Sequence, residues 1–343
     1  MASKRIDNAA LFAVLSSLAD NKQAIGRRYA FWSNGAPALE AAVAAAAMTQ
    51  DELGHARTLY PLLDNFTQAE AEPTQIEPET RTLHYSLAFL DQDFRGWMDF
   101  VATNFLIDTA LTTFFEAAQN SSYEALRQRS RKIIQEERIH VMHGEGWVRR
   151  LANAGGAVRA AMLDSLERLW NETLCWFGPQ DDPVMQQLYQ EGVIDASPDE
   201  LRRRYLHKIM PTLSSLDINV PVTFDAATKS WQPSAPLPWY SWNATGRRLN
   251  TSGPIVRRWA RSIGPYRRMI MGYNRDDAEK TPEVTCPYCG STDTELFSLF
   301  GQQLLTVQYY CNTCHTPFER VKDDDVLDDY TAQSQKARKE GQR

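Results

Sequence analysis

Two Glu-x-x-His pairs are the residues of this 343-residue chain with the clearest capacity for chemistry: Glu52 with His55, and Glu137 with His140. Residues three positions apart on a helix share one face, so each pair can aim a carboxylate and an imidazole at the same point. A single pair is more often a core histidine beside a surface acid. Two pairs on separate long helices instead predict a shared site for metal ions that accept oxygen and imidazole ligands, such as iron.

A third acidic residue, Asp108, fits the same site. It lies among apolar residues on the third predicted helix, where an acid that is neither paired nor bound to a metal is costly to bury. The layout resembles the carboxylate-bridged di-iron bundles of ferritin-like proteins, in which each remaining helix supplies one further carboxylate. The first helix is the difficulty, because from Leu11 to Trp32 it contains no glutamate and its only acid is Asp20.

Four of the five cysteines form a second candidate site, as Cys286-x-x-Cys289 and Cys311-x-x-Cys314 with 21 residues between the two pairs. This spacing predicts four thiolates in a tetrahedron around one zinc ion, stapling a β-ribbon too small to have its own core. Iron in a rubredoxin-like site is the main alternative. Cys175 stands in an apolar helical stretch and is interpreted as a core residue.

The spacing of apolar residues up to about residue 215 is mostly three or four, which is typical of helices. Polar and glycine-containing breaks divide this region into segments. We therefore expect an all-α ferritin-like bundle of long antiparallel helices. The expected helices span 8–32, 37–68, 80–118, 122–153, 156–176 and 198–214.

Four parts are expected along the chain: the helical bundle (1–217), an extended arm (218–284), the zinc ribbon (285–322) and a polar tail (323–343). Within the arm, residues 226–274 contain four tryptophans and eight Lys or Arg residues, without one Asp or Glu. Disordered segments rarely carry so many large aromatic residues. We expect the arm to pack on its own bundle or on the acidic surface of a partner protein.

The composition excludes several classes of protein. With 37 Lys and Arg against 43 Asp and Glu, the net charge is −6, and no recognised motif supports binding to nucleic acid. No apolar stretch approaches the roughly 20 residues of a membrane-spanning helix. A phosphate-binding glycine loop and a Rossmann fingerprint are also missing, so NAD and flavin are not expected as ligands. The paired cysteines fit a reducing compartment, which predicts a cytoplasmic location.

Three stretches resemble the ferritin-like subunits of the bacterial phenylacetyl-CoA epoxidase, a multicomponent ring-oxygenating complex, and the likeness extends over about residues 15–215. Residues 18–32, 36–40 and 135–151 are most similar to the second ferritin-like subunit, which is usually considered structural. Residues 50–55, Gln-Asp-Glu-Leu-Gly-His, instead resemble the catalytic subunit, where the matching Glu and His bind iron.

The resemblance implies a role for each candidate residue. It places Lys22 on the first helix where the family has a ligating glutamate. Two alternatives follow: a relic site held by a network of Lys22 and carboxylates, or a metal site with an unusual or incomplete first ligand. Five residues fall on the family's di-iron ligand positions: Glu52, His55, Asp108, Glu137 and His140.

The cysteine-rich segment resembles the C-terminal zinc-binding tail of the small assembly protein encoded with the epoxidase, on residues 285–294, 297–301 and 309–319. Together the resemblances imply a subunit of a di-iron monooxygenase complex that acts on an aromatic or acyl-CoA substrate. The implied partners are another ferritin-like oxygenase subunit and a separate reductase. The alternative is a non-catalytic structural or assembly partner with a degenerate metal site, so whether the chain is itself an enzyme stays open.

Overall fold

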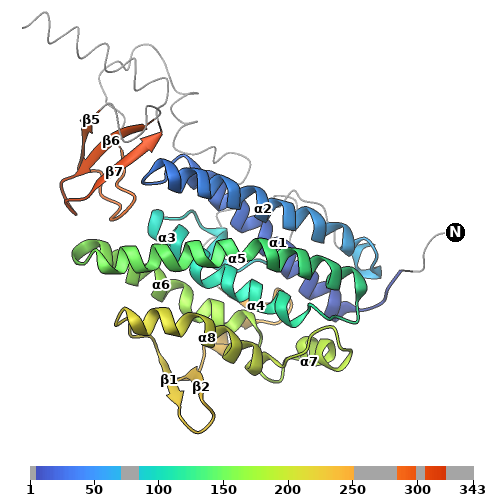
Figure 1. Cartoon of the computed structure of the whole chain (residues 1–343). Coiled ribbons are helices and arrows are strands. Elements are labelled where there is room, and N and C mark those ends of the chain that lie inside the picture. Colours follow the sequence, from blue (N-terminus) through green and yellow to red (C-terminus); the bar gives the residue numbers. More distant parts are fainter. Residues whose placement is uncertain (1–4, 71–84, 251–283, 299–305, 322–343) are drawn as a thin grey trace, which may run out of the picture.

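A computed structural model of the chain describes residues 5–70, 85–250, 284–298 and 306–321. Long helices run side by side and form the body of the molecule, and a small β module stands at one end (Figure 1). The predicted ferritin-like bundle with a C-terminal ribbon is confirmed. The principal helices are α1 (Ala9–Ser33), α2 (Leu39–Leu63), α5 (Glu124–Asn153), α6 (Gly156–Trp176) and α8 (Pro198–Ser215).

Helix α1 is buried along most of its length. Its N-terminus is capped by Asn8, whose side chain accepts a hydrogen bond of 2.9 Å from the Leu11 N–H, as helix N-caps commonly do. Gly26 lets α1 approach α2 closely, because a Cβ at this position would lie 2.8 Å from the Leu53 side chain. Lys22, one helical turn before Gly26, is fully buried.

The third long helix differs from the prediction at its start. The helix begins at Trp97 and not at residue 80, and of the preceding described residues only Ala88–Asp91 form a short 3-10 turn. The Tyr85 N–H bonds to the Asp20 carboxylate at 3.1 Å, and the Leu87 N–H bonds to the Asn21 side chain at 2.9 Å. These groups on α1 take N–H donors that a helix would use internally, so the apolar pattern of the segment reflects burial without helix.

From Trp97 onward the helix is continuous but not uniform. It consists of α3 (Trp97–Ala102), a π-helical segment η4 (Thr103–Asp108) and α4 (Thr109–Ala117). Such π segments are rare and are frequent at functional sites. Here the segment ends at the predicted ligand Asp108.

One further helix, α7 (Pro183–Gln190), was not predicted. Asp182 caps it by accepting a hydrogen bond of 3.0 Å from the Val184 N–H, and Pro183 occupies its first turn. Both are ordinary helix-start signals. In this short segment the apolar residues were too few for the helical period to show.

The described part of the arm lies on its own bundle. It forms two hairpins, β1 (Val222–Asp225) with β2 (Ser230–Pro233), and β3 (Trp242–Asn243) with β4 (Arg248–Leu249). Two of its arginines make buried ion pairs with the bundle: Arg247 with Asp182 at 2.7 Å, and Arg248 with Asp91. The rest of the predicted basic segment, 251–274, lies outside the described residues.

The C-terminal module is a three-stranded antiparallel sheet in the order β5 (Thr294–Ser298), β6 (Thr306–Cys311) and β7 (Pro317–Val321). Tyr309 pairs with Phe318 across β6 and β7, and their rings stack. In Figure 1 the sheet stands beside the start of α2. Within the described part of the chain, no helix is long and apolar enough to cross a membrane.

Candidate metal centres

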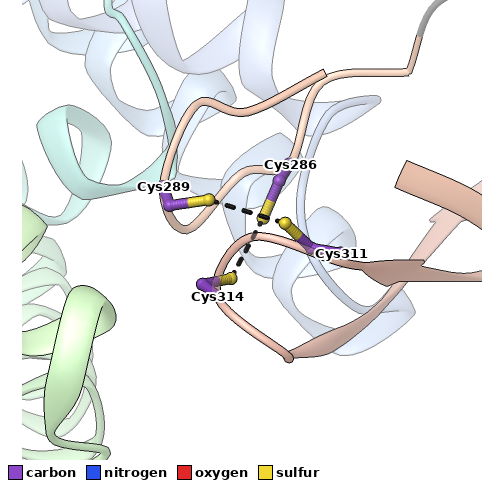
Figure 2. Close-up of side chains that lie close together, drawn as sticks. All are labelled: Cys286, Cys289, Cys311 and Cys314. Atoms are coloured by element: carbon purple, nitrogen blue, oxygen red, sulfur yellow. Dashed lines mark hydrogen bonds between the residues drawn. The ribbon is translucent and has the colours of Figure 1, made fainter. Parts of the chain in front are cut away.

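The structure brings the four predicted zinc ligands together (Figure 2). The Sγ atoms of Cys286 and Cys314 are 3.7 Å apart, and those of Cys289 and Cys311 are 3.6 Å apart. Four thiolates about 2.3 Å from one zinc ion would be separated by about 3.8 Å. The cysteines therefore fit a closed tetrahedral site, which supports zinc as the metal.

The thiols of this site differ in how easily they ionise. Burial raises the pKa of Cys289 to about 11. Burial also opposes ionisation of Cys311, but N–H groups of Cys314 and Thr313 outweigh it and lower the pKa of Cys311. Cys175 lies apart from the group, fully buried in α6, and burial raises its pKa to about 12. It is a core residue, as the sequence indicated.

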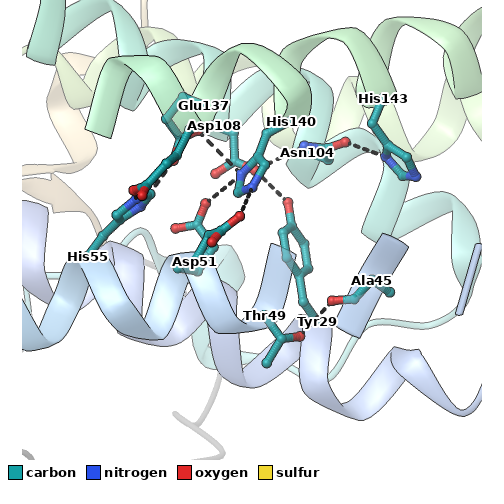
Figure 3. A network of polar contacts seen from close by, with 12 residues as sticks. Tyr29, Ala45, Thr49, Asp51, His55, Asn104, Asp108, Glu137, His140 and His143 are labelled. Atoms are coloured by element: carbon teal, nitrogen blue, oxygen red, sulfur yellow. Dashed lines mark hydrogen bonds and ion pairs between the residues drawn. The ribbon is translucent and has the colours of Figure 1, made fainter. Parts of the chain in front are cut away.

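Four of the five predicted iron ligands also come together in the structure. Each of them offers one ligand atom, and these atoms lie within 4.8 Å of one another. They come from α2, the end of η4, and α5 (Figure 3). All are buried, which makes the group a candidate cation site inside the bundle. These residues, named here the carboxylate cluster, are Glu52, Asp108, Glu137 and His140.

Lys22 lies inside the carboxylate cluster. Its Nζ is 2.6 Å from Glu137 Oε1 and 3.0 Å from each carboxylate oxygen of Glu52. The distance to Asp108 Oδ1 is 3.6 Å. All four side chains are fully buried, so the ammonium is the cation that the three carboxylates share.

The predicted ligand His55 is not one of the four clustered residues. Its Nδ1 lies 3.2 Å from Glu137 Oε1, and its Nε2 lies 2.7 Å from the carboxylate of Glu136. On the other side, His140 Nδ1 lies 3.1 Å from Glu52, and its Nε2 lies 3.3 Å from Asp51. Asp51 and Glu136, which were interpreted as surface or supporting acids, thus orient the two imidazoles from outside.

Lys22 stays protonated in this environment. Burial alone would lower the pKa of its ammonium, but the three surrounding carboxylates outweigh burial and raise it. Burial and the nearby Glu52 raise the pKa of Asp108 to about 7, although Lys22 opposes the shift. Burial also opposes ionisation of Glu137, but Lys22 and then His140 hold its pKa well below the usual range. Lys22 and Glu137 therefore form a charged pair.

The imidazole of His140 is also held in its charged form. Burial would lower its pKa, but Glu137 and Glu52 raise it to about 11. A protonated imidazole has no lone pair for a metal. A protonated ammonium has none either, so in this state the cluster is satisfied by the chain's own positive charges.

A chain of hydrogen bonds that sequence reasoning missed continues from Asp108. Tyr29 donates its hydroxyl to Asp108 Oδ2 at 2.7 Å, and the Asn104 amide donates to the same oxygen at 3.0 Å. The Asn104 carbonyl in turn lies 2.9 Å from His143 Nδ1 (Figure 3). Spacing offered a signal: Tyr29 follows Lys22 by two helical turns, and Asn104 precedes Asp108 by about one.

The donor types at the cluster and the residue among them point in different directions. Carboxylates and imidazoles are ligands that iron accepts, and their convergence fits a metal-binding ancestry of the site. Lys22 does not fit a di-metal centre, because its charged Nζ takes the position between the carboxylates. The arrangement can neutralise three buried acids and hold four helices in register.

A ferritin-like bundle with a buried carboxylate cluster and a four-cysteine ribbon defines the class of this protein. The chain belongs to the family described as phenylacetic acid catabolic protein, whose model matches residues 2–232. A second family model, the PaaD zinc beta ribbon domain, matches residues 272–322. The predicted resemblance is thereby confirmed for both parts of the chain.

Three relatives from Escherichia coli (strain K12) divide the similarity, and all three carry the name of 1,2-phenylacetyl-CoA epoxidase. The chain is 28% identical to the epoxidase component lettered A, over 55% of its own length and 62% of that relative. It is 26% identical to the component lettered C, over 62% of its length and 84% of that relative. Against the putative component lettered D it is 42% identical over 45 residues, 13% of this chain and 27% of that relative. The chain thus spans less than two thirds of the first of these relatives.

Proposed function

We propose that this chain is the non-catalytic ferritin-like subunit of a multisubunit oxygenase related to phenylacetyl-CoA epoxidase. The observation that carries the proposal is the position of Lys22 Nζ, 2.6 to 3.6 Å from three buried carboxylates. Because the ammonium supplies the positive charge that the acids need, the bundle is stable without iron. Its role is then to support a homologous subunit that carries the metal.

The expected complex follows from this role. The similarity to components of one epoxidase supports assembly with another ferritin-like oxygenase subunit. A separate reductase would supply electrons, and the aromatic or acyl-CoA substrate would react on the partner subunit. Co-expression with a catalytic homologue should yield a stable complex that is isolated by size exclusion. A chain that stays alone in that experiment contradicts the proposed role.

A second candidate is a catalytic subunit with an incomplete di-iron site. One observation favours it: the ligand atoms of the carboxylate cluster lie within 4.8 Å of one another, close enough to share a cation. If a metal were bound there, it would provide oxygen activation, and these residues would hold it. Lys22 would have to lose its proton or leave the cluster first.

Metal analysis and iron titration distinguish the two candidates. We expect about one zinc and no tightly bound iron per purified chain. Lys22→Glu removes the competing charge and adds an oxygen ligand, so iron affinity should rise at least tenfold. Lys132→Glu, a charge reversal at an exposed lysine of α5, is the matched control and should leave iron binding unchanged. Two tightly bound irons in the native protein would overturn the non-catalytic role.

A further inference from the structure

The zinc ribbon sits on one corner of the bundle through main-chain hydrogen bonds. The Trp97 N–H, in the first turn of α3, donates to the Pro287 carbonyl at 3.0 Å. The Glu319 N–H, on β7, donates to the Pro37 carbonyl at 2.7 Å, just before α2. We name the bundle residues Pro37, Gly96 and Trp97 the docking corner.

The docking corner is shaped for this contact. A Cβ at Gly96 would lie only 3.3 Å from the Pro287 carbonyl oxygen. Gly96 has an extended backbone, with φ of −173°, so space and not conformation is what this position requires. The apolar side chains of the ribbon, including Tyr288, belong to the same continuous buried cluster as the bundle core.

The part of the ribbon that touches α3 is part of the metal-binding loop. Pro287 and Tyr288 lie between Cys286 and Cys289, so the ion that joins these cysteines also fixes the loop between them. A site of four thiolates contributes folding energy when zinc binds. The carbonyl that Trp97 meets is therefore correctly placed only when the ribbon is loaded.

The docking corner also reaches the interior of the bundle. Trp97 stacks on Phe100 with ring centroids 4.3 Å apart, and Phe100 lies 4.3 Å from the Tyr29 ring. Tyr29 donates its hydroxyl to Asp108 at 2.7 Å. Packed aromatic rings thus connect the ribbon contact to the carboxylate cluster.

We propose that the docking corner is a binding site for a zinc-loaded four-cysteine ribbon in its own right. The ribbon is held by the corner's main-chain groups and apolar contact, and the covalent connection through residues 251–283 is not required. The partner that this surface fits is any chain that presents such a ribbon. Binding depends on zinc because the metal shapes the loop at Pro287.

A cleavable form of the full-length chain tests the proposal. A protease site placed within 251–283 allows the connection to be cut after the zinc-loaded protein has folded. We expect the C-terminal fragment to stay with the bundle in size exclusion, and to leave it when a chelator removes zinc. A fragment that separates from the bundle while it still holds zinc overturns the proposal, and so does a fragment that remains bound after zinc is lost.

Two matched variants locate the contact. In the cleaved protein, Gly96→Val should weaken retention of the fragment about tenfold or more, because the new side chain crowds the Pro287 carbonyl. Gly146→Val is the control, since a Cβ there meets nothing within 4 Å, and it should retain the fragment fully. Equal retention in both variants would contradict the assigned site.

Amide hydrogen exchange in the uncut wild-type chain provides a readout that needs no variant. The Trp97 amide should exchange slowly with zinc bound and at least tenfold faster after zinc is removed. Amides in the middle of α5 should keep their rates. An unchanged rate at Trp97 after zinc removal would overturn the zinc dependence even if Gly96→Val failed to fold.

Discussion

The four-cysteine site and the carboxylate cluster are two groups of metal-binding side chains that differ in what lies at their centre. The four thiols surround a space that fits one zinc ion, with sulfur atoms 3.6 to 3.7 Å apart across each pair. The carboxylate cluster surrounds Lys22, whose charge is already shared among three acids. Ligand type and spacing are alike persuasive in both. The residue between the ligands decides whether a metal is needed.

The largest expected effect is loss of the zinc site. Cys289→Ser removes one of four ligands, so zinc should be lost and residues 284–298 and 306–321 should unfold while the helices persist. Metal analysis and hydrogen exchange measure the two parts. Cys175→Ser is the control, because this cysteine lies outside the site, and it should keep its zinc. A ribbon that remains ordered in the metal-free variant would remove the contrast between the sites.

The next effect is the cost of emptying the centre of the carboxylate cluster. Lys22→Met keeps a chain of similar length but leaves three buried acids without their shared cation. Removing one partner from a buried ion pair costs about 3–5 kcal/mol, and the free energy of unfolding in urea should fall by about this amount. Lys132→Met, whose exposed ion pair spans 3.7 Å, should cost less than about 1 kcal/mol. Similar losses in the two variants would show that Lys22 is not the keystone of the cluster.

The smallest effect is a pH dependence at the edge of the cluster. Burial, and then the positive charge of His140, lower the pKa of His143 to about 4, whereas in the unfolded chain it is about 6.5. Between these values the unfolded chain takes up a proton that the folded chain refuses, so stability falls as the pH falls from about 6.5 to about 4.

His143→Gln should remove that part of the acid sensitivity. Relative to wild type, the variant should lose about 1–3 kcal/mol less unfolding free energy between pH 7 and pH 4.5. Urea titrations at several pH values provide the measurement. His207→Gln, at an exposed histidine of α8, should follow the wild-type curve. If both variants follow that curve, His143 does not titrate as described.

Sequence periodicity was sufficient for what depends on local geometry. The spacing of Glu52 with His55 and of Glu137 with His140 placed each pair on one helix face, and the structure brings three of these residues together with Asp108. Lys22 could not be placed from spacing alone. Its position followed only from the family resemblance, because an isolated lysine in a helix carries no signal of burial.

Features that depend on distant contacts were not predictable. The segment before Trp97 is not helical because Asp20 and Asn21, more than sixty residues away, bind its N–H groups. The basic arm meets its own bundle through ion pairs between Arg247 and Asp182, and between Arg248 and Asp91. A charge pattern shows that such a segment needs acidic partners, but not which ones.

The π-helical segment that ends at Asp108 sets the angular phase of the third helix. A π turn accommodates one residue more than the surrounding α-helix would, and each residue of an α-helix advances the side chains by about 100°. Without that residue, everything beyond η4 would turn by this angle relative to Trp97 and Phe100. The segment therefore lets one helix present an aromatic stack to the ribbon at one end and a carboxylate to Lys22 at the other.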